Sequence, residues 1–530
     1  MTLKVVHKGA SSEAVAASMT ELLNSKVASR LFAKDHTLWG KDAEAESSIR
    51  LGWVDAAEKS LLLLPELEIL AKRLRDDGLT RVVLCGMGGS SLAPEVITKT
   101  AGVELVVLDS TDPSQIGQAL TVDLDRTVVV VSSKSGSTVE TDSQKRSFEA
   151  AFEAAGIEKT DRIVIVTDPD SPMHTQAVKD GYRVFLADPM VGGRYSALTA
   201  FGVVPSFLAG VDVEKILRSA SSAVELLRSD DLANPGLILG AAIARTAGAQ
   251  GPKDKLGFVP DGSSISGFGD WVEQLIAEST GKLGRGVLPV VLEASSHEVS
   301  ADAADTLLIG LSADAADSKF ELAVSGELGE VLLLWEVATV VASRLLGVNP
   351  FDQPDVESAK IAARAVLDSP AEALEFDHSD DGVAIAALGY RLSSTELANC
   401  LAELFDSAAP DSYLSIHCYL NREKFASATS LRELVARRAK RPTTFGWGPR
   451  FLHSTGQYHK GGPKQGVFIQ IVSGDGEDLA IPGRQFGYRK LIDSQASGDA
   501  KVLAAGGSRV LVLSLSNVEL GIQKLVRALS

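Results

Sequence analysis

The sequence has 530 residues, which is too long for one ordinary hydrophobic core and predicts two or three domains. Apolar residues make up 45% and charged residues 23%, values that exclude a disordered, collagen-like or coiled-coil chain. The formal net charge of −17 argues against a nucleic-acid partner, so an anionic small substrate needs a local pocket of N–H donors or positive charge.

We expect neither a membrane span nor a disulfide framework. The first residues lack the apolar core of a signal peptide, and no apolar run reaches the length of about 18 residues that indicates a transmembrane helix. Cys85, Cys400 and Cys418 are not spaced as metal ligands and cannot form a closed disulfide set. Cys85 lies in an apolar run and is predicted to be buried. These features favour a reducing, cytoplasmic setting.

Residues 10–75 are rich in Ala, Glu, Leu and Lys and are predicted to be helical. After them the pattern changes to short β-branched runs that alternate with helical segments, which indicates a parallel sheet covered on both faces. The predicted strands are 81–86, 104–109, 127–133, 162–168 and 183–188, with helices at 140–155 and 171–180.

A second unit of the same kind is predicted to begin near residue 235. Its predicted strands are 256–260, 287–292 and 306–311, with helices at 266–280, 328–346 and 354–368. The polar, turn-rich segment 377–382 is a predicted boundary. Beyond it, a mixed α/β region is predicted, with a helix at 393–408, strands at 412–420, 466–472 and 508–515, and a C-terminal helix.

Two loops at strand ends carry the strongest chemical signal. The first predicted strand ends in Gly86-Met-Gly-Gly-Ser-Ser, and the third ends in Ser132-Ser-Lys-Ser-Gly-Ser-Thr. Glycines allow close approach of the backbone to a ligand, and hydroxyls and N–H groups at a helix N-terminus can surround a phosphate. Each loop alone could be a plain strand–helix turn, but two on neighbouring strands favour a phosphate site. The predicted phosphate ligands are Gly89, Ser90, Ser133, Lys134, Ser135, Ser137 and Thr138.

These loops resemble the sugar isomerase (SIS) fold, and four further segments are similar to signatures of the phosphoglucose isomerase family. They are Val191-Gly-Gly-Arg-Tyr-Ser, Gln274-Leu-Ile-Ala-Glu-Ser-Thr-Gly-Lys, Phe351-Asp-Gln-Pro-Asp-Val-Glu-Ser-Ala-Lys and Leu452-His-Ser-Thr-Gly-Gln-Tyr-His-Lys-Gly-Gly. The resemblance spans residues 50–470, and it is closest to the isomerase half of transaldolase–isomerase fusion proteins.

The resemblance implies an α/β protein with two doubly wound, parallel-sheet SIS-type (flavodoxin-like) units. With the element pattern, it predicts a helical N-terminal extension over 1–75, a first phosphosugar-binding domain over 76–230, a second SIS-type domain over 231–376 and an α/β region over 377–530.

The resemblance also implies an aldose–ketose isomerase that interconverts glucose 6-phosphate and fructose 6-phosphate through an enediolate. Glu278 is the expected base, Arg194 the stabiliser of negative oxygen, and Lys360 a ring-opening or hydroxyl-binding residue. The plain alternatives are a solvated helix carboxylate for Glu278, a salt bridge to Asp188 or another neighbour for Arg194 and an exposed cation for Lys360.

Ring opening needs a further acid–base group, for which the resemblance offers His459 or His453, with His459 preferred. Gly88, Gly193 and Gln353 are expected to contact the substrate. Proton transfer between side chains needs no metal or organic cofactor, and we expect none; His417-Cys418 lies in a strand whose side chains alternate in direction and is a poor ligand set.

Three alternatives remain open at this point. A dual phosphoglucose/phosphomannose isomerase fits the same loops, and a non-catalytic phosphosugar sensor would need the loops but not Glu278, Arg194 and Lys360 together. An amidotransferring amino-sugar isomerase usually carries an N-terminal cysteine nucleophile, which Met1-Thr2 does not supply. A homodimer, with a phosphorylated hexose as the substrate, is expected from the resemblance alone.

Overall fold

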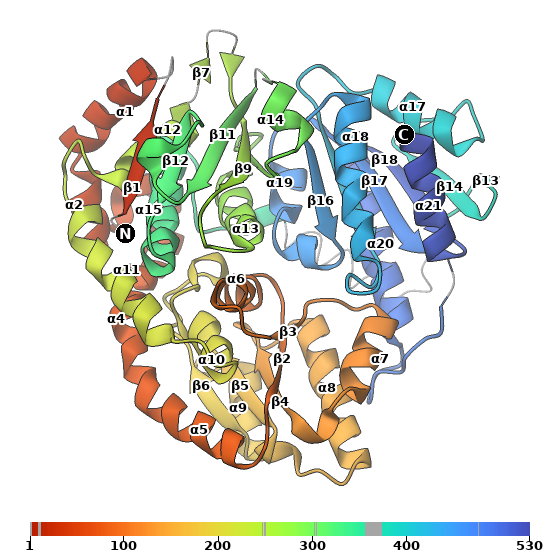
Figure 1. Cartoon of the computed structure of the whole chain (residues 1–530), viewed down its shortest axis with the longest axis horizontal. Helices are drawn as coiled ribbons and strands as arrows, with labels where there is room; N and C mark the ends of the chain where they lie inside the picture. Colours follow the sequence, from red (N-terminus) through yellow and green to blue (C-terminus); the bar gives the residue numbers. More distant parts are fainter. Residues whose placement is uncertain are drawn as a thin grey trace.

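The computed structural model describes residues 3–8, 12–245, 247–248, 251–301, 303, 305–355, 374–474 and 476–530. Three α/β units, each built around a largely parallel sheet, meet near the centre of the molecule (Figure 1). The first sheet lies at the bottom of this view, the second at the upper left and the third at the upper right.

The first sheet is entirely parallel and has the strand order β3-β2-β4-β5-β6. Its strands are β2 (Arg81–Gly86), β3 (Val106–Leu108), β4 (Thr127–Ser132), β5 (Ile163–Thr167) and β6 (Arg183–Leu186). Alternate residues of β2 belong to different apolar clusters: Val82 and Leu84 to one, Val83 and Cys85 to another. Both faces of the sheet are therefore covered, as a continuous apolar strand requires.

Helices on the two faces of the first sheet complete these clusters. They are α6 (Leu92–Ala101), α7 (Pro113–Thr121), α8 (Val139–Ala154), α9 (Pro172–Asp180) and α10 (Ala200–Leu208). Helix α5 (Leu64–Asp76) adds Leu67, Leu70 and Leu74 to the cluster that holds Val82. The other N-terminal helices are α1 (Ser12–Asn24), α2 (Val27–Phe32), α3 (Glu44–Ser47) and α4 (Ala56–Ser60).

The second sheet has the order β1-β12-β11-β9-β10 and is parallel except for the edge strand β1. Its strands are β1 (Lys4–His7), β9 (Lys255–Asp261), β10 (Leu288–Val291), β11 (Thr306–Ser312) and β12 (Leu322–Ser325). Its helices are α11 (Val213–Leu227), α12 (Pro235–Arg245), α13 (Phe268–Thr280), α14 (His297–Ala301) and α15 (Leu328–Leu346). Two short strands, β7 (Ala247–Gly248) and β8 (Gly251–Pro252), form a separate ribbon.

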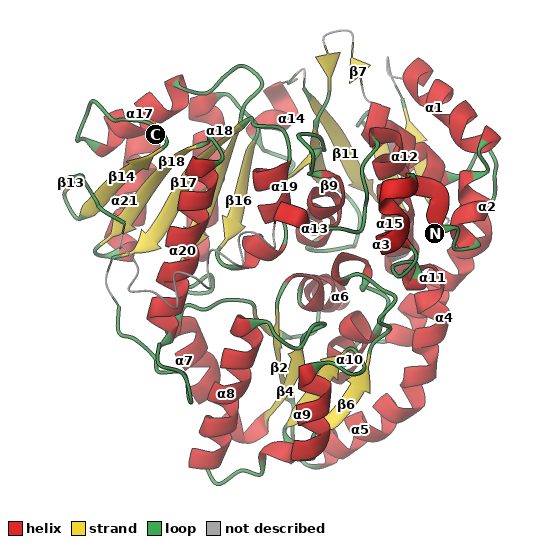
Figure 2. Cartoon of the chain, turned by 180° about the vertical axis from the view of Figure 1, so that it is seen from behind, coloured by secondary structure: helices red, strands yellow, loops and turns green. Residues whose placement is uncertain are grey.

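The third sheet has the order β13-β14-β18-β17-β15-β16 and a parallel core of four strands, β18-β17-β15-β16. Its strands are β13 (His378–Asp380), β14 (Val383–Leu388), β15 (Tyr413–Tyr419), β16 (Thr443–Trp447), β17 (Gly466–Ser473) and β18 (Arg509–Leu515). Its helices are α17 (Leu397–Asp406), α18 (Leu431–Ala439), α19 (Gly456–Gly461), α20 (Tyr488–Ala505) and α21 (Val518–Leu529), seen from behind in Figure 2.

The three sheets share one parallel arrangement. Counting parallel strands in chain order, each sheet has the sequence 2-1-3-4: β3-β2-β4-β5 in the first, β10-β9-β11-β12 in the second and β16-β15-β17-β18 in the third. In each, the chain leaves its first strand to one side and returns on the other. Sites in such sheets lie beyond the carboxyl ends of the strands, where the order reverses.

The predicted fold class is confirmed, and every predicted strand is present within a few residues of its expected position. The strands that were not predicted are short or lie at or beside a sheet edge; they are β1, β7, β8, β12, β13, β14 and β16. Cys85 is buried as predicted. The predicted helix 354–368 lies largely outside the described residues. None of the described helices is long and apolar enough to cross a bilayer.

Candidate active site

A buried ion pair joins Glu278 and Arg194. Glu278 lies in the last turn of α13, and Arg194 lies in the 3₁₀ turn Gly193–Tyr195, which follows Gly192. Arg194 Nη1 donates to Glu278 Oε2 at 2.9 Å, and the two side chains are only 2% and 4% exposed. A charge-assisted hydrogen bond in such a dry place is stronger than the same pair in water.

Backbone carbonyls hold the Arg194 guanidinium on its other side. Its Nε donates to Pro350 O at 3.2 Å and its Nη2 to Asp352 O at 3.0 Å. The alternative salt bridge to Asp188 does not form, since Asp188 pairs with Lys59. Arg194 is therefore fixed against Glu278.

Lys282, which closes the Glu278 segment, binds the same loop as Arg194. Its Nζ donates to Asn349 O at 2.7 Å, to Asp352 O at 2.8 Å and to Asp352 Oδ1 at 2.7 Å. Burial, followed by repulsion from Arg194, lowers the pKa of Lys282 to about 8, against the attraction of Asp352. This lysine was not among the predicted site residues; it fastens the end of α13 to the 349–352 loop.

The glycine loop after β2 packs directly on this ion pair and its helix. A Cβ on Gly89 would lie 2.0 Å from Gly193 O, next to Arg194. Gly88 has a φ of +56°, and a Cβ there would lie 2.9 Å from Gln274 Nε2, one helical turn before Glu278. Only glycine permits these approaches. The predicted glycine loop, with Gly88 and Gly89, therefore lies against Gly193 and close to Arg194 and the Glu278 helix.

The hydroxyl loop lies between β4 and α8, beside the glycine loop at the point where the strand order reverses. Ser133 Oγ is 3.2 Å from Thr138 Oγ1, and Ser135 Oγ is 3.0 Å from Ser137 Oγ. Their hydroxyls gather at the N-terminus of α8, where backbone N–H groups attract an anion. Lys134 forms an ion pair with Asp168 at the end of β5, so its charge is shared with a carboxylate.

His453 lies where both loops and α13 meet. Its Nε2 is 3.1 Å from Glu140 Oε1, in the first turn of α8, and its backbone O accepts from Gln274 Nε2 at 2.8 Å. Gln495 Nε2 also donates to Glu140 Oε1, at 2.7 Å. Sequence reasoning assigned no role to Glu140 or Gln274. The only available signal for Glu140 was its place directly after the hydroxyl loop.

His459, the histidine preferred from the sequence, faces the core of the third unit. Its Nδ1 is 2.8 Å from Tyr413 Oη, and its ring packs near His417 and Phe468. It is 4% exposed, and burial lowers its pKa well below the usual range, which disfavours a proton carrier there. The described contacts of its side chain are with this core, whereas His453 reaches the loops.

A family model described as phosphoglucose isomerase matches residues 73–284. A protein of Natronomonas pharaonis named "probable glucose-6-phosphate isomerase" is 30% identical over 338 residues, which cover 54% of this chain and 78% of that protein. The chain belongs to the phosphoglucose isomerase family. A glucose-6-phosphate isomerase of Rubrobacter xylanophilus is 28% identical over 370 residues, covering 57% of this chain and 85% of that protein.

Two solved structures share the fold of this phosphoglucose isomerase family member. A hypothetical protein of Thermus thermophilus superposes with a TM-score of 0.57 at 24% identity, covering 69% of this chain and all of that one. A glucose-6-phosphate isomerase of Chlamydia trachomatis superposes with a TM-score of 0.51 at 19% identity, covering 65% of this chain and 78% of that one.

Three predicted site residues, Lys360, Gln353 and Ser90, remain to be placed. Lys360 lies outside the described residues, while Gln353 is half-buried beside Asp352 in the loop that holds Arg194. Ser90 is buried in the glycine loop. Among the described residues, no group of three or more His, Cys, Asp and Glu side chains could hold a metal ion.

Proposed function

We propose that this chain is a glucose-6-phosphate isomerase, which interconverts glucose 6-phosphate and fructose 6-phosphate. The observation that carries the proposal is the buried Glu278–Arg194 pair, packed against two phosphate-type loops. A phosphosugar sensor would have no use for a dry carboxylate and guanidinium at this place.

The phosphate group sits in the hydroxyl loop. Ser133, Ser135, Ser137 and Thr138 supply donors there, together with the backbone N–H groups that begin α8. Gly89 and Ser90 line the neighbouring wall. Lys134 adds a positive charge that Asp168 orients. These donors and the Lys134 charge attract the phosphate locally, although the chain as a whole has a net charge of −17 and repels anions.

His453 opens the sugar ring by moving a proton at the ring oxygen, and Glu140 orients its imidazole. Glu278 then takes the proton from C2 of the open aldose and returns it to C1, while the proton of the C2 hydroxyl passes to the oxygen on C1; the two transfers together convert the aldose into the ketose. Arg194 places its charge where the enediolate oxygen becomes negative. Lys360 and Gln353 are proposed to bind hydroxyls of the sugar.

We also propose that the enzyme is cytoplasmic and that it forms a homodimer. The first part rests on three free, buried cysteines, which suit a reducing compartment. The second rests on family resemblance, and size-exclusion chromatography with light scattering tests it directly.

A coupled assay tests the activity. The purified chain receives fructose 6-phosphate, and glucose 6-phosphate is detected through a dehydrogenase that reduces NADP. We expect turnover, with mannose 6-phosphate as a parallel substrate to measure specificity. Binding of fructose 6-phosphate in calorimetry without any turnover would instead identify a sensor and contradict the proposal.

A further inference from the structure

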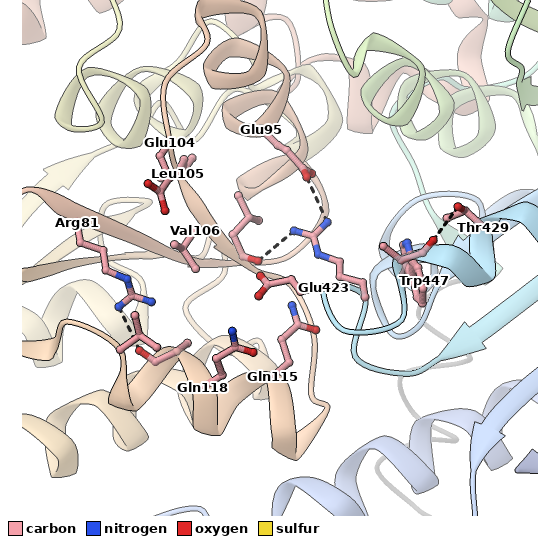
Figure 3. Close-up of a pocket in the computed structure, with 15 residues that line it drawn as sticks. Arg81, Glu95, Glu104, Leu105, Val106, Gln115, Gln118, Glu423, Thr429 and Trp447 are labelled. Atoms are coloured by element: carbon pink, nitrogen blue, oxygen red, sulfur yellow. Dashed lines mark hydrogen bonds and ion pairs between the residues drawn. The ribbon is translucent and has the colours of Figure 1, made fainter. Parts of the chain in front are cut away.

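A pocket separate from the active site opens where the third unit meets the first. Its cavity measures about 600 Å³ and lies between the edge strand β3 with helix α7 on one side and the carboxyl ends of β15 and β16 on the other (Figure 3). The site in the first unit uses the same kind of sheet edge, since ligands bind beyond the carboxyl ends of parallel strands. The cavity has the size of a small-molecule site.

Gln115 is the most informative residue in this pocket. It is 1% exposed, and neither its amide nitrogen nor its amide oxygen has a hydrogen-bond partner in the structure. Other buried glutamines nearby have at least one bonded amide atom: Gln144 Nε2 donates to Ser110 O at 2.9 Å, although its Oε1 has no partner among the described residues, and Gln495 Nε2 donates to Glu140 at 2.7 Å. A buried amide is normally satisfied. Gln115 rises from α7 into the pocket wall (Figure 3), where an occupant could supply both missing bonds.

Only some of the charged side chains that line the pocket around Gln115 are occupied by hydrogen bonds within the protein. Glu104 and Glu423 attract the Arg81 guanidinium from a distance. Arg81 uses one terminal nitrogen for Ala119 O, at 3.2 Å, and for Thr127 Oγ1, at 3.0 Å. Arg422 is fully engaged, since it donates to Glu95 and to Val107 O. The pocket thus offers carboxylate acceptors and amide donors, without a spare cluster of positive charge.

We propose that this pocket binds an uncharged polyhydroxylated molecule, such as an unphosphorylated sugar. Hydroxyl groups both donate and accept, which matches the mixture of the Gln115 amide with the Glu104 and Glu423 carboxylates. The Trp447 ring, at the end of β16, supplies a flat apolar face for the C–H side of a sugar ring. The lining holds the three carboxylates of Glu95, Glu104 and Glu423 against the two guanidiniums of Arg81 and Arg422, so a phosphorylated sugar would meet a net negative charge.

The pocket also connects to the active site. Arg422 Nη1 donates to Glu95 Oε1 at 3.2 Å, and Glu95 pairs with the buried Arg450. Arg450 begins the short turn that ends at His453. An occupant that contacts Arg422 or Glu95 therefore acts on the ion pairs that hold this turn, and the pocket is placed to adjust turnover. This second part rests on the proposed isomerase activity, whereas binding itself does not.

Saturation-transfer NMR on the full chain tests the binding. D-glucose is the probe, and an equilibrium mixture of the two hexose phosphates is added in excess to occupy the catalytic site. We expect ring protons of glucose to receive saturation, with at least a fivefold loss of signal in Gln115→Leu. The same change at Gln176, on the exposed face of α9, is the matched control and should leave the signal unchanged.

The charge of the ligand is tested with glucose 1-phosphate, and its shape with adenosine. Both should give less than one-fifth of the glucose signal. The proposal is overturned if glucose gives no signal at 10 mM, if Gln115→Leu retains it, or if the phosphorylated or nucleoside probe binds better. If glucose did not bind to a chain with full isomerase activity, the proposal of a sugar-binding pocket would be wrong, whereas the proposed isomerase function would still hold.

Kinetics tests the link to turnover. Saturating glucose should change kcat of the wild-type chain at least twofold and should not change that of Gln115→Leu, whose basal kcat should match the wild type. An equal effect of glucose on both chains would mean that it acts at the catalytic site, and no effect on either would refute the link.

Discussion

Glu278 is the residue on which the proposed chemistry turns. In Glu278→Gln the amide keeps the shape of the side chain and can still accept from Arg194, but it cannot take a proton from carbon. We expect kcat to fall at least ~10³-fold while substrate affinity changes little. The coupled assay measures the first and titration calorimetry the second. Glu225→Gln, on the exposed surface of α11, is the control; a Glu278 variant with wild-type kcat would exclude this glutamate as the base.

The two candidate histidines are separated by paired substitutions. His453→Asn should lower kcat/KM about 10²-fold with little loss of stability, because its ring faces Glu140 at the loops. His459→Asn should keep kcat within about twofold per folded molecule but lose about 1–3 kcal/mol of unfolding free energy, because it packs in the core beside Tyr413. Activity assays and urea unfolding measure these two effects. The opposite pattern would indicate that His459, and not His453, opens the sugar ring.

The lowered pKa of Lys282 leads us to expect that the free energy of unfolding depends on pH. Its pKa of about 8 in the folded chain lies below the ordinary value of 10.5, so between these values the unfolded chain holds a proton that the native lysine has released. Stability therefore rises with pH across this window, by about 3 kcal/mol in full. Urea unfolding from pH 7 to 10 should show this rise in the wild type and not in Lys282→Met. Parallel pH profiles of the two chains would contradict the lowered pKa.

At the residue scale, contiguous motifs were predictable and long-range partners were not. Glu278 and Arg194 each sit in a distinctive local segment, and the structure joins them across 84 positions. His453 and His459 share one segment, so only their burial in the fold separates them. The pairing of Glu140 with His453 spans 313 positions, and no local pattern in this single sequence indicates it.

At the element scale, strands buried on both faces were predictable because they form continuous apolar runs. Strand β4 is buried at every position, as its Thr-Val-Val-Val-Val-Ser sequence indicates. Two of the missed strands lack this pattern: β16, Thr-Thr-Phe-Gly-Trp, contains a glycine and lies at an edge, and β13, His-Ser-Asp, is polar. The missed strand β14, Val-Ala-Ile-Ala-Ala-Leu, does carry an apolar run. Edge strands need not be apolar on both faces, so their periodicity is weak.

The turn from Arg450 to His453 is an element held by buried charge. Arg450 lies between Glu95, Asp109, at 2.7 Å, and Asp270, at 3.2 Å, which come from the first and second units. Burial alone would lower the pKa of Arg450, but these carboxylates hold it above its usual value. A charge this well surrounded cannot be removed without leaving uncompensated acids in the interior.

We expect Arg450→Met to lose about 3–5 kcal/mol of unfolding free energy. It should also lower kcat/KM more than tenfold, because the turn that carries His453 loses its anchor. Adding Glu95→Leu should recover part of the stability, since one unpaired carboxylate is then gone. The control is Arg218→Met, whose exposed side chain pairs only along α11. Urea unfolding and the coupled assay measure both effects; a loss no larger than that of the control would contradict this assignment.

At the scale of the whole molecule, the three side chains proposed for the proton chemistry come one from each unit: Arg194 follows the first sheet, Glu278 lies on α13 of the second unit, and His453 follows β16 of the third. The C-terminal region was predicted only as mixed α/β, and its sheet repeats the 2-1-3-4 order of the other two. This shared strand order could not be predicted from the apolar runs of single strands, because strand order depends on contacts between distant segments.

Each pair of units shares an apolar core, which predicts how the molecule unfolds. One cluster joins the first and second sheets, including Val82 and Leu307, and another joins Val290 of the second sheet to Phe468 of the third. A third cluster packs Val129 of the first sheet with Leu491 of α20. Because no unit can lose its fold without exposing apolar surface on both of its neighbours, we expect one cooperative transition.

Scanning calorimetry of the intact chain tests this expectation. A single peak should appear, with a calorimetric enthalpy equal to the van't Hoff enthalpy. Two resolved peaks would mean that the shared cores contribute less than the cores within each unit. In Arg450→Met, the loss of a side chain that ties all three units together should broaden or split the peak, whereas Arg218→Met should leave a single transition, because its guanidinium pairs along its own helix.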